Sequence, residues 1–270
     1  MTRIAEIQPT LLSVVWPGKN ISISTRHIVE LLFLALLVLS MRGALVAGFP
    51  EKIILPGLAI LSIGLASISG LIFTGNLSSY ISQILRTISL ALLGSLFIAL
   101  VAQIQVPLWP VPITGQTFGV LVVGLAFGCR LGALTLILYL CEGLIGLPVF
   151  SGDKSGYSTL VGPTGGYIVG FIFAAAITGY FAEKKWDRNV WYTGLAMLLG
   201  NLAIYIPGLI WLTIFFEGPG SQYVAVIGAS TAIGAALTKG LLPFIIGDIL
   251  KLALAAIIFP YVWRFVPRFK

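Results

Sequence analysis

Residues 241–263 read LLPFIIGDILKLALAAIIFPYVW, an apolar run interrupted by two charged side chains, Asp248 and Lys251. An α-helix needs about 20 apolar residues to cross a bilayer, because each residue advances about 1.5 Å and the hydrocarbon core is about 30 Å thick. The run is long enough. It therefore predicts a membrane-spanning helix that holds an acidic and a basic group inside the bilayer.

The rest of the chain has the same apolar character. Hydrophobic residues make up 58% of the 270 and charged residues 9%, whereas about 25% of the residues in soluble domains are charged. We expect an all-α membrane protein with about eight transmembrane helices. The apolar runs lie at 28–48, 53–74, 80–103, 112–128, 131–149, 164–182, 190–215 and 241–263.

The stretch 224–238 is also apolar but rich in small residues, which favours an interfacial or re-entrant helix over the last span; a ninth span is the alternative. Basic residues argue for eight, because one side then carries eleven and the other four. This asymmetry predicts the cytoplasmic membrane with both termini in the cytoplasm. The eleven are Arg3, Lys19, Arg26, Arg86, Arg130, Lys184, Lys185, Arg188, Arg264, Arg268 and Lys270, and the four are Arg42, Lys52, Lys154 and Lys239.

The net charge of +7 does not indicate nucleic-acid binding, because the basic residues lie between apolar spans. Two cysteines and one histidine predict no disulfide framework, metal site or cofactor. Composition changes near residue 80, beyond which Gly, Pro and intramembrane polar residues become frequent. We expect an N-terminal extension with two transmembrane helices over residues 1–79 and a six-helix core over residues 80–270.

Asp248 and Lys251 are three residues apart, so both project from one face of the helix. A charged group inside the bilayer is costly unless it is paired or faces a polar cavity. The alternative to a functional role is an ion pair whose two charges only neutralise each other. Because the pair follows Pro243 closely, near the outer end of the span, we interpret it as part of a ligand site.

Other polar groups are predicted inside the membrane. Thr114, Gln116 and Thr117 open the fourth span, and Asn201 lies in the seventh. A threonine can bond its own helix backbone, whereas the amides of Gln116 and Asn201 need other partners.

Residues 162–167 read GPTGGY, a tight turn at a helix start, whose free backbone N–H groups near Gly165 suit either an anion or a plain turn. Small residues then recur every fourth position, which predicts close helix packing. A similar stripe in the third span predicts packing or a docking face for another membrane subunit. The first stripe is Gly166, Gly170, Ala174 and Thr178, and the second is Ala91, Ser95 and Ala99.

Taken together, these motifs resemble the BioY family, the biotin-binding S components of energy-coupling factor (ECF) transporters. The resemblance covers roughly residues 80–263. It rests on four ordered motifs, at Val106–Thr117, Gly146–Phe150, Gly162–Tyr167 and Leu242–Lys251. The extension 1–79 and Gly115, in place of a larger residue, depart from the family pattern.

The resemblance implies a six-helix core that binds biotin near the outer face through Asp248 and Lys251, with Gln116, Tyr167 and Asn201 as further ligand-binding positions. It also implies that the Ala91/Ser95/Ala99 stripe docks onto the transmembrane coupling subunit. Because the chain has no Walker motif, partner ATPases would supply the energy. A solitary biotin carrier is one alternative, and an intramembrane enzyme with Asp248 as a base is another.

Overall fold

The structure of the chain, a computed structural model, describes residues 79–265. The spans expected at 28–48 and 53–74 lie outside this range. The described elements are α4 (Ser79–Ala102), β1 (Gln105–Val106), β2 (Ile113–Thr114), α5 (Gln116–Phe127), α6 (Cys129–Leu144), α7 (Tyr157–Val161), α8 (Gly165–Glu183), η1 (Trp186–Arg188), α9 (Val190–Glu217), α10 (Gln222–Val226), α11 (Ala232–Gly240), η2 (Leu242–Phe244) and α12 (Ile245–Phe265).

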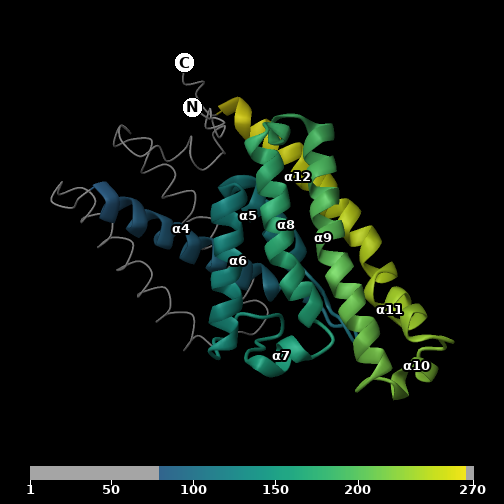
Figure 1. Cartoon of the computed structure of the whole chain (residues 1–270). Coiled ribbons are helices and arrows are strands. Elements are labelled where there is room, and N and C mark those ends of the chain that lie inside the picture. Colours follow the sequence, from purple (N-terminus) through teal and green to yellow (C-terminus); the bar gives the residue numbers. More distant parts are fainter. Residues whose placement is uncertain (1–78, 266–270) are drawn as a thin grey trace, which may run out of the picture.

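The long helices form a bundle centred on α8 and α9, which run side by side (Figure 1). The helices α5 and α6 contact α8, and α12 contacts α9. The helix α4 runs across the bundle and packs against α6. Figure 1 also shows two distinct ends, one with α7, α10 and α11 and the other with η1 and the last turns of α12.

Within residues 79–265, three helical stretches are long and apolar enough to cross a membrane, at Gly165–Glu183, Val190–Glu217 and Ala232–Arg264. The apolar stretches Arg86–Ala102 and Gln116–Phe127 are shorter. Each of the six spans expected within residues 79–265 contains a helix, and the number of membrane crossings stays a prediction.

Helix α9 is apolar on its outer as well as its inner face. An apolar stripe recurs at every fourth residue and is exposed, while the opposite face is buried in the core. A helix that is apolar all round belongs in a core or in lipid. The exposed stripe comprises Leu198, Leu202, Ile206, Ile210 and Ile214.

The fourth predicted span begins later than expected. Residues 113–114 form β2, which pairs antiparallel with β1, so that Gln105 lies opposite Thr114. The helix α5 therefore begins at Gln116, and Gly128, with φ of 84°, ends it. Its 12 residues span only about 18 Å at about 1.5 Å per residue.

The stretch 224–238 is not one helix, contrary to expectation. Gly228 adopts a φ of 77° in the turn between α10 and α11. The helix α11 packs against α9 and also contacts η2, at the start of the last predicted span. With nine residues it is far shorter than the roughly 20 that a crossing needs.

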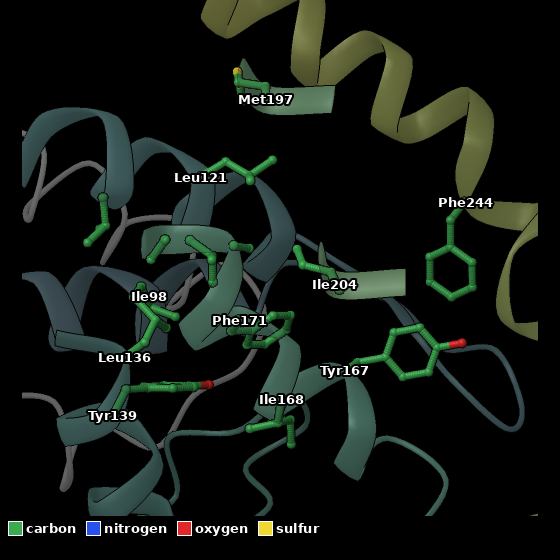
Figure 2. Close-up of a cluster of buried hydrophobic side chains, with 14 of the residues drawn as sticks. Ile98, Leu121, Leu136, Tyr139, Tyr167, Ile168, Phe171, Met197, Ile204 and Phe244 are labelled. Carbon is green, nitrogen blue, oxygen red and sulfur yellow. The ribbon is translucent and has the colours of Figure 1, made fainter. Parts of the chain in front are cut away.

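The core lies between α8 and its neighbours, where side chains from several helices converge (Figure 2). Tyr139 and Ile98 are completely buried, and Met197 and Ile204 bring α9 into the same cluster. The core is thus shared by α4, α6 and α9 around α8.

The small-residue stripe of α8 packs against α9, as expected. A Cβ on Gly166 would lie 2.4 Å from the carbonyl oxygen of Pro207, and one on Gly170 would lie 2.9 Å from Cα of Ile204. Real Cβ atoms do not approach backbone so closely. Small residues at such crossings let helix backbones approach in membrane proteins.

We expect Gly170→Val to destabilise the protein, because backbone atoms of α9 block the new side chain. Overpacking typically costs about 1–3 kcal/mol, so the melting temperature in detergent should fall by roughly 5–10 °C. Val169→Leu, on the exposed face of the same helix, is the matched control. Equal melting temperatures for the two variants would contradict the close α8–α9 packing.

The end of the bundle at η1 holds a buried acid. Asp187 is fully buried, and its Oδ2 accepts a hydrogen bond of 2.5 Å from the indole N–H of Trp263 in α12. Oδ1 has no hydrogen-bond partner among residues 79–265, and the Arg188 guanidinium lies 4.3 Å from the centre of the Trp263 ring. Burial raises the pKa of Asp187 to about 6, because the charged form loses its hydration.

This shift predicts how stability depends on pH. A carboxyl with a raised pKa holds its proton more tightly in the folded state, so its contribution to stability falls as the pH rises from about 4 to about 6. Asp187→Asn keeps an acceptor for Trp263 but cannot ionise. We therefore expect the melting temperature of Asp187→Asn, relative to the unsubstituted protein, to increase between pH 4.5 and pH 8.

The control for this comparison is Glu217→Gln, an exposed acid at the other end of α9. Its melting temperature relative to the unsubstituted protein should change less over the same pH range. If the difference in melting temperature between Asp187→Asn and the unsubstituted protein did not change with pH, this result would contradict the raised pKa of Asp187.

Candidate ligand-binding site

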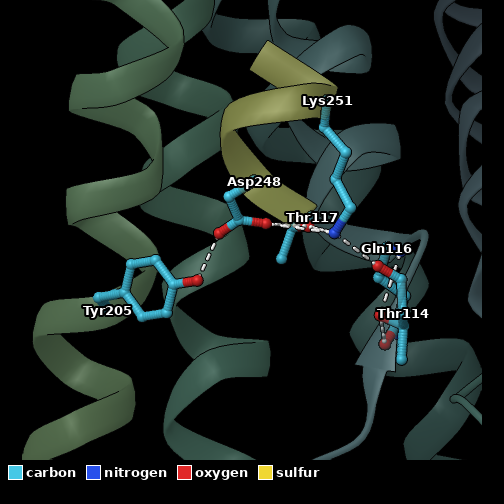
Figure 3. Close-up of polar contacts among 6 residues, drawn as sticks. All are labelled: Thr114, Gln116, Thr117, Tyr205, Asp248 and Lys251. Carbon is cyan, nitrogen blue, oxygen red and sulfur yellow. Dashed lines mark hydrogen bonds and ion pairs between the residues drawn. The ribbon is translucent and has the colours of Figure 1, made fainter. Parts of the chain in front are cut away.

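The predicted polar residues of the fourth and last spans meet in one place. Thr117 lies in the first turn of α5, directly after β2. Asp248 and Lys251 come from α12, and α9 contributes Tyr205 (Figure 3). Because β2 of the strand pair occupies residues 113–114, α5 begins only at Gln116. This start determines where the polar residues of α5 lie relative to α12.

Lys251 is bound on three sides. Its ammonium donates to the Thr114 carbonyl oxygen at 2.9 Å, to Thr117 Oγ1 at 2.8 Å and to Asp248 Oδ1 at 3.2 Å. Three N–H donors are all that a lysine has. The charge is therefore both neutralised and fully hydrogen-bonded.

Asp248 is almost completely buried. Its Oδ2 accepts a hydrogen bond from the Tyr205 hydroxyl, and its Oδ1 accepts from Lys251 and, at 3.4 Å, from Thr117. Asp248 also lies in the first turn of α12, where the helix dipole favours a negative charge. Removal of one member of such a buried pair typically costs about 3–5 kcal/mol, because the other charge is left unpaired.

Gln116 belongs to a second, adjoining network. Its Nε2 donates to the Tyr139 hydroxyl at 2.7 Å, and that hydroxyl donates to the Val149 carbonyl oxygen at 2.8 Å. The Thr114 hydroxyl donates to Gln116 Oε1 at 3.1 Å. These bonds hold the amide of Gln116 in one orientation.

A cavity lies beside both networks. Hydroxyls and amides line one part of it, and aromatic rings from α8, η2 and the α6–α8 loop line another, an arrangement common in small-molecule sites. The lining residues are Val111, Pro112, Thr114, Gln116, Thr117, Phe150, Ser151, Lys154, Thr159, Thr164, Tyr167, Ile168, Phe171, Ile204, Tyr205 and Phe244.

Among the predicted site residues, Thr114, Gln116 and Tyr167 line the cavity, and Asp248 and Lys251 lie behind it in contact with Thr117. Tyr167 is wedged against Gly208, whose missing Cβ leaves room for its ring, and its hydroxyl donates to the Gly240 carbonyl oxygen at 3.0 Å.

Asn201 and Gly165 are not among the cavity-lining residues. Asn201 is buried, and its Oδ1 has no hydrogen-bond partner in the part of the chain that the structure describes. A Cβ on Gly165 would lie 1.7 Å from the Leu160 carbonyl oxygen. Glycine is therefore required there for the tight turn between α7 and α8.

Tyr205 and Lys154 were not predicted as site residues. Tyr205 stands one helical turn after Asn201, which is the one hint that the sequence contains. Lys154 comes from a loop, and no periodic pattern points a loop residue toward a cavity. The structure describes no group of His, Cys, Asp or Glu side chains suited to a metal ion.

The prediction that the small residues of α4 form a docking face differs from what the structure shows. Ala91 and Ser95 are buried, and the Ser95 hydroxyl donates to a carboxylate oxygen of Glu142 in α6. Ala99 is half-buried against the core. The stripe therefore packs inside this protein and does not form an open surface, because a polar Ser side chain in an apolar helix turns toward its hydrogen-bond partner.

Comparison with known proteins gives consistent results. The pattern of the BioY family matches residues 75–268. A Pyrococcus horikoshii protein named as a probable biotin transporter BioY is 40% identical over 62% of this chain and 91% of its own length. The biotin transporter BioY of Thermotoga maritima is 37% identical over 61% of this chain and 90% of its own length.

A solved structure agrees with these sequences. The crystal structure of the S-component for biotin from an ECF-type ABC transporter matches with a TM-score of 0.56 and 26% sequence identity, over 67% of this chain and 93% of that chain. Its fold is therefore similar to the described part of this chain. The chain belongs to the BioY family, whose members are membrane transporters and not enzymes.

Proposed function

We propose that the protein captures biotin and carries it across the cytoplasmic membrane as the substrate-binding S component of an ECF transporter. The observation that carries the proposal is the Asp248–Tyr205–Lys251 network beside a cavity with aromatic walls. The names of the relatives and of the solved structure support biotin as the solute.

The chemistry of biotin suits this site. Its ureido group offers two N–H donors and one carbonyl acceptor. A carboxylate has about four acceptor positions, and Tyr205, Lys251 and Thr117 occupy three of those of Asp248. Asp248 would accept one ureido N–H in the remaining position and a second in exchange for the long bond from Thr117. The ureido carbonyl would accept from Lys251 or from the Tyr205 hydroxyl, either of which would exchange one of its present protein hydrogen bonds for the ligand.

The remainder of biotin is apolar apart from its carboxylate. Its thioether ring would lie among Phe150, Tyr167, Phe171 and Phe244, which line the cavity. Apolar walls with a few placed polar groups are typical of small-molecule sites. Gly165 and Asn201, whose buried Oδ1 has no hydrogen-bond partner among the described residues, would support the site from outside its lining.

The orientation in the membrane follows from the basic residues. Lys184, Lys185 and Arg188 lie at or beside η1, and Arg264 ends α12 at the same end of the bundle. Lys154 and Lys239 belong to the opposite end. By the positive-inside rule, the η1 end faces the cytoplasm, which supports a cytoplasmic C-terminus. A cytoplasmic N-terminus, a multi-pass core over 80–270 and an appended extension over 1–79 belong to the same proposal.

Asp248→Ala should weaken biotin binding on the order of 100-fold, because it removes the acceptor and leaves Lys251 buried without a counter-charge. Equilibrium binding of labelled biotin to the purified protein measures this. The matched control is Asp153→Asn, at an exposed loop position with φ of 56° that asparagine tolerates. Tight biotin binding by Asp248→Ala would contradict the assigned site, and no binding by the unsubstituted protein would contradict the substrate.

Coupling to partner subunits can be tested separately. In cells without other biotin transporters, we expect labelled biotin to accumulate only when the ECF transmembrane coupling subunit and its ATPases are co-expressed, because the chain carries no nucleotide-binding motif. Biotin binding to the purified chain should not depend on them. Accumulation without these subunits would favour a solitary carrier.

A further inference from the structure

The loop between α6 and α8 carries a lysine into the cavity wall. Lys154 lines the cavity, yet it comes from the segment before α7 and not from a membrane-spanning helix. Neither the Asp248–Lys251 network nor the aromatic wall accounts for a charge at this place.

The backbone around Lys154 is held firmly. Phe150 and Lys154 form an antiparallel bridge, in which the Phe150 N–H donates to the Lys154 carbonyl oxygen at 3.1 Å. Gln103, just after α4, accepts from the N–H groups of Gly152 and Asp153 at 3.1 and 3.3 Å and donates to the Phe150 carbonyl oxygen at 3.1 Å. One side chain thus ties the whole turn to the end of α4.

The charge of Lys154 is not neutralised within the described part of the chain. Lys154 is the one residue with a charged side chain among those that line the cavity. The ion pair found among the described residues is that of Asp248 and Lys251, so the Lys154 ammonium has no carboxylate partner there. Its side chain is exposed, so the ammonium stays hydrated until a ligand arrives.

The two parts of the cavity differ in chemistry. The Thr117–Tyr205 side adjoins a neutral, fully paired network, which suits hydrogen-bonding groups without net charge. The loop side presents one positive charge. A solute with a neutral cyclic head and a single carboxylate at the end of its tail satisfies both.

We propose that Lys154 is a specificity-determining residue that binds the carboxylate of the transported solute. The inference rests on the proposed function and deepens it, since it concerns how biotin is distinguished from neutral analogues. A charge-assisted hydrogen bond is stronger than a neutral one, and water at the exposed loop reduces the gain.

The test compares biotin with biotinamide, which has the same ring system and a neutral tail. We expect the unsubstituted protein to bind biotin on the order of tenfold more tightly than biotinamide. Lys154→Gln should lower the ratio of the two affinities to near one and change biotinamide binding by no more than about twofold. Lys154→Arg should retain most of the preference.

Lys239→Gln is the control, because it removes the same charge from α11 without touching the cavity lining. An unchanged biotin-to-biotinamide ratio in Lys154→Gln would overturn the inference. An equal loss of affinity for biotin and biotinamide would also overturn the inference, since Lys154 would then only stabilise the conformation of the loop. Failure of the unsubstituted protein to bind biotin would overturn the proposed function and this inference with it.

Discussion

The central constraint in this molecule is the placement of two charges, Asp248 and Lys251, in the first turns of a helix that is apolar from there to its last turn. Inside a bilayer neither charge is stable without partners. The structure supplies them from distant parts of the chain, because Lys251 bonds to residues 137 and 134 positions away in sequence, and Tyr205 of α9 bonds to Asp248. The two charges obtain their partners through the arrangement of the strand pair and of helices α5, α9 and α12.

The close contact between α8 and α9 makes that arrangement possible. Gly166 and Gly170 bring the two backbones together. The same contact sets Tyr167 of α8 against Gly208 of α9, so its ring forms part of the cavity wall. Tyr205, on α9, lies 6.3 Å from Tyr167 between ring centres. Helix packing through small residues thus determines the shape of the cavity as well as the stability of the bundle.

The loop between α6 and α8 completes the cavity. Its turn is tied to α4 through Gln103, and it adds Phe150 and Lys154 to the wall. The helical network provides paired hydrogen-bonding groups, and the loop provides a charge that has no ion-pair partner among the described residues. The proposed recognition of a neutral head and a charged tail rests on this difference.

The sequence by itself determined the apolar character of the chain, the helices near their predicted positions, and the common face of Asp248 and Lys251, because helical periodicity is a local property. The family motifs pointed to BioY on the same local basis. Only the tertiary structure decided that Tyr205 joins the network, that Ser95 turns inward to Glu142, and that Asn201 stands outside the cavity lining. Such placements depend on how helices rotate and pack against one another, which periodicity alone does not specify.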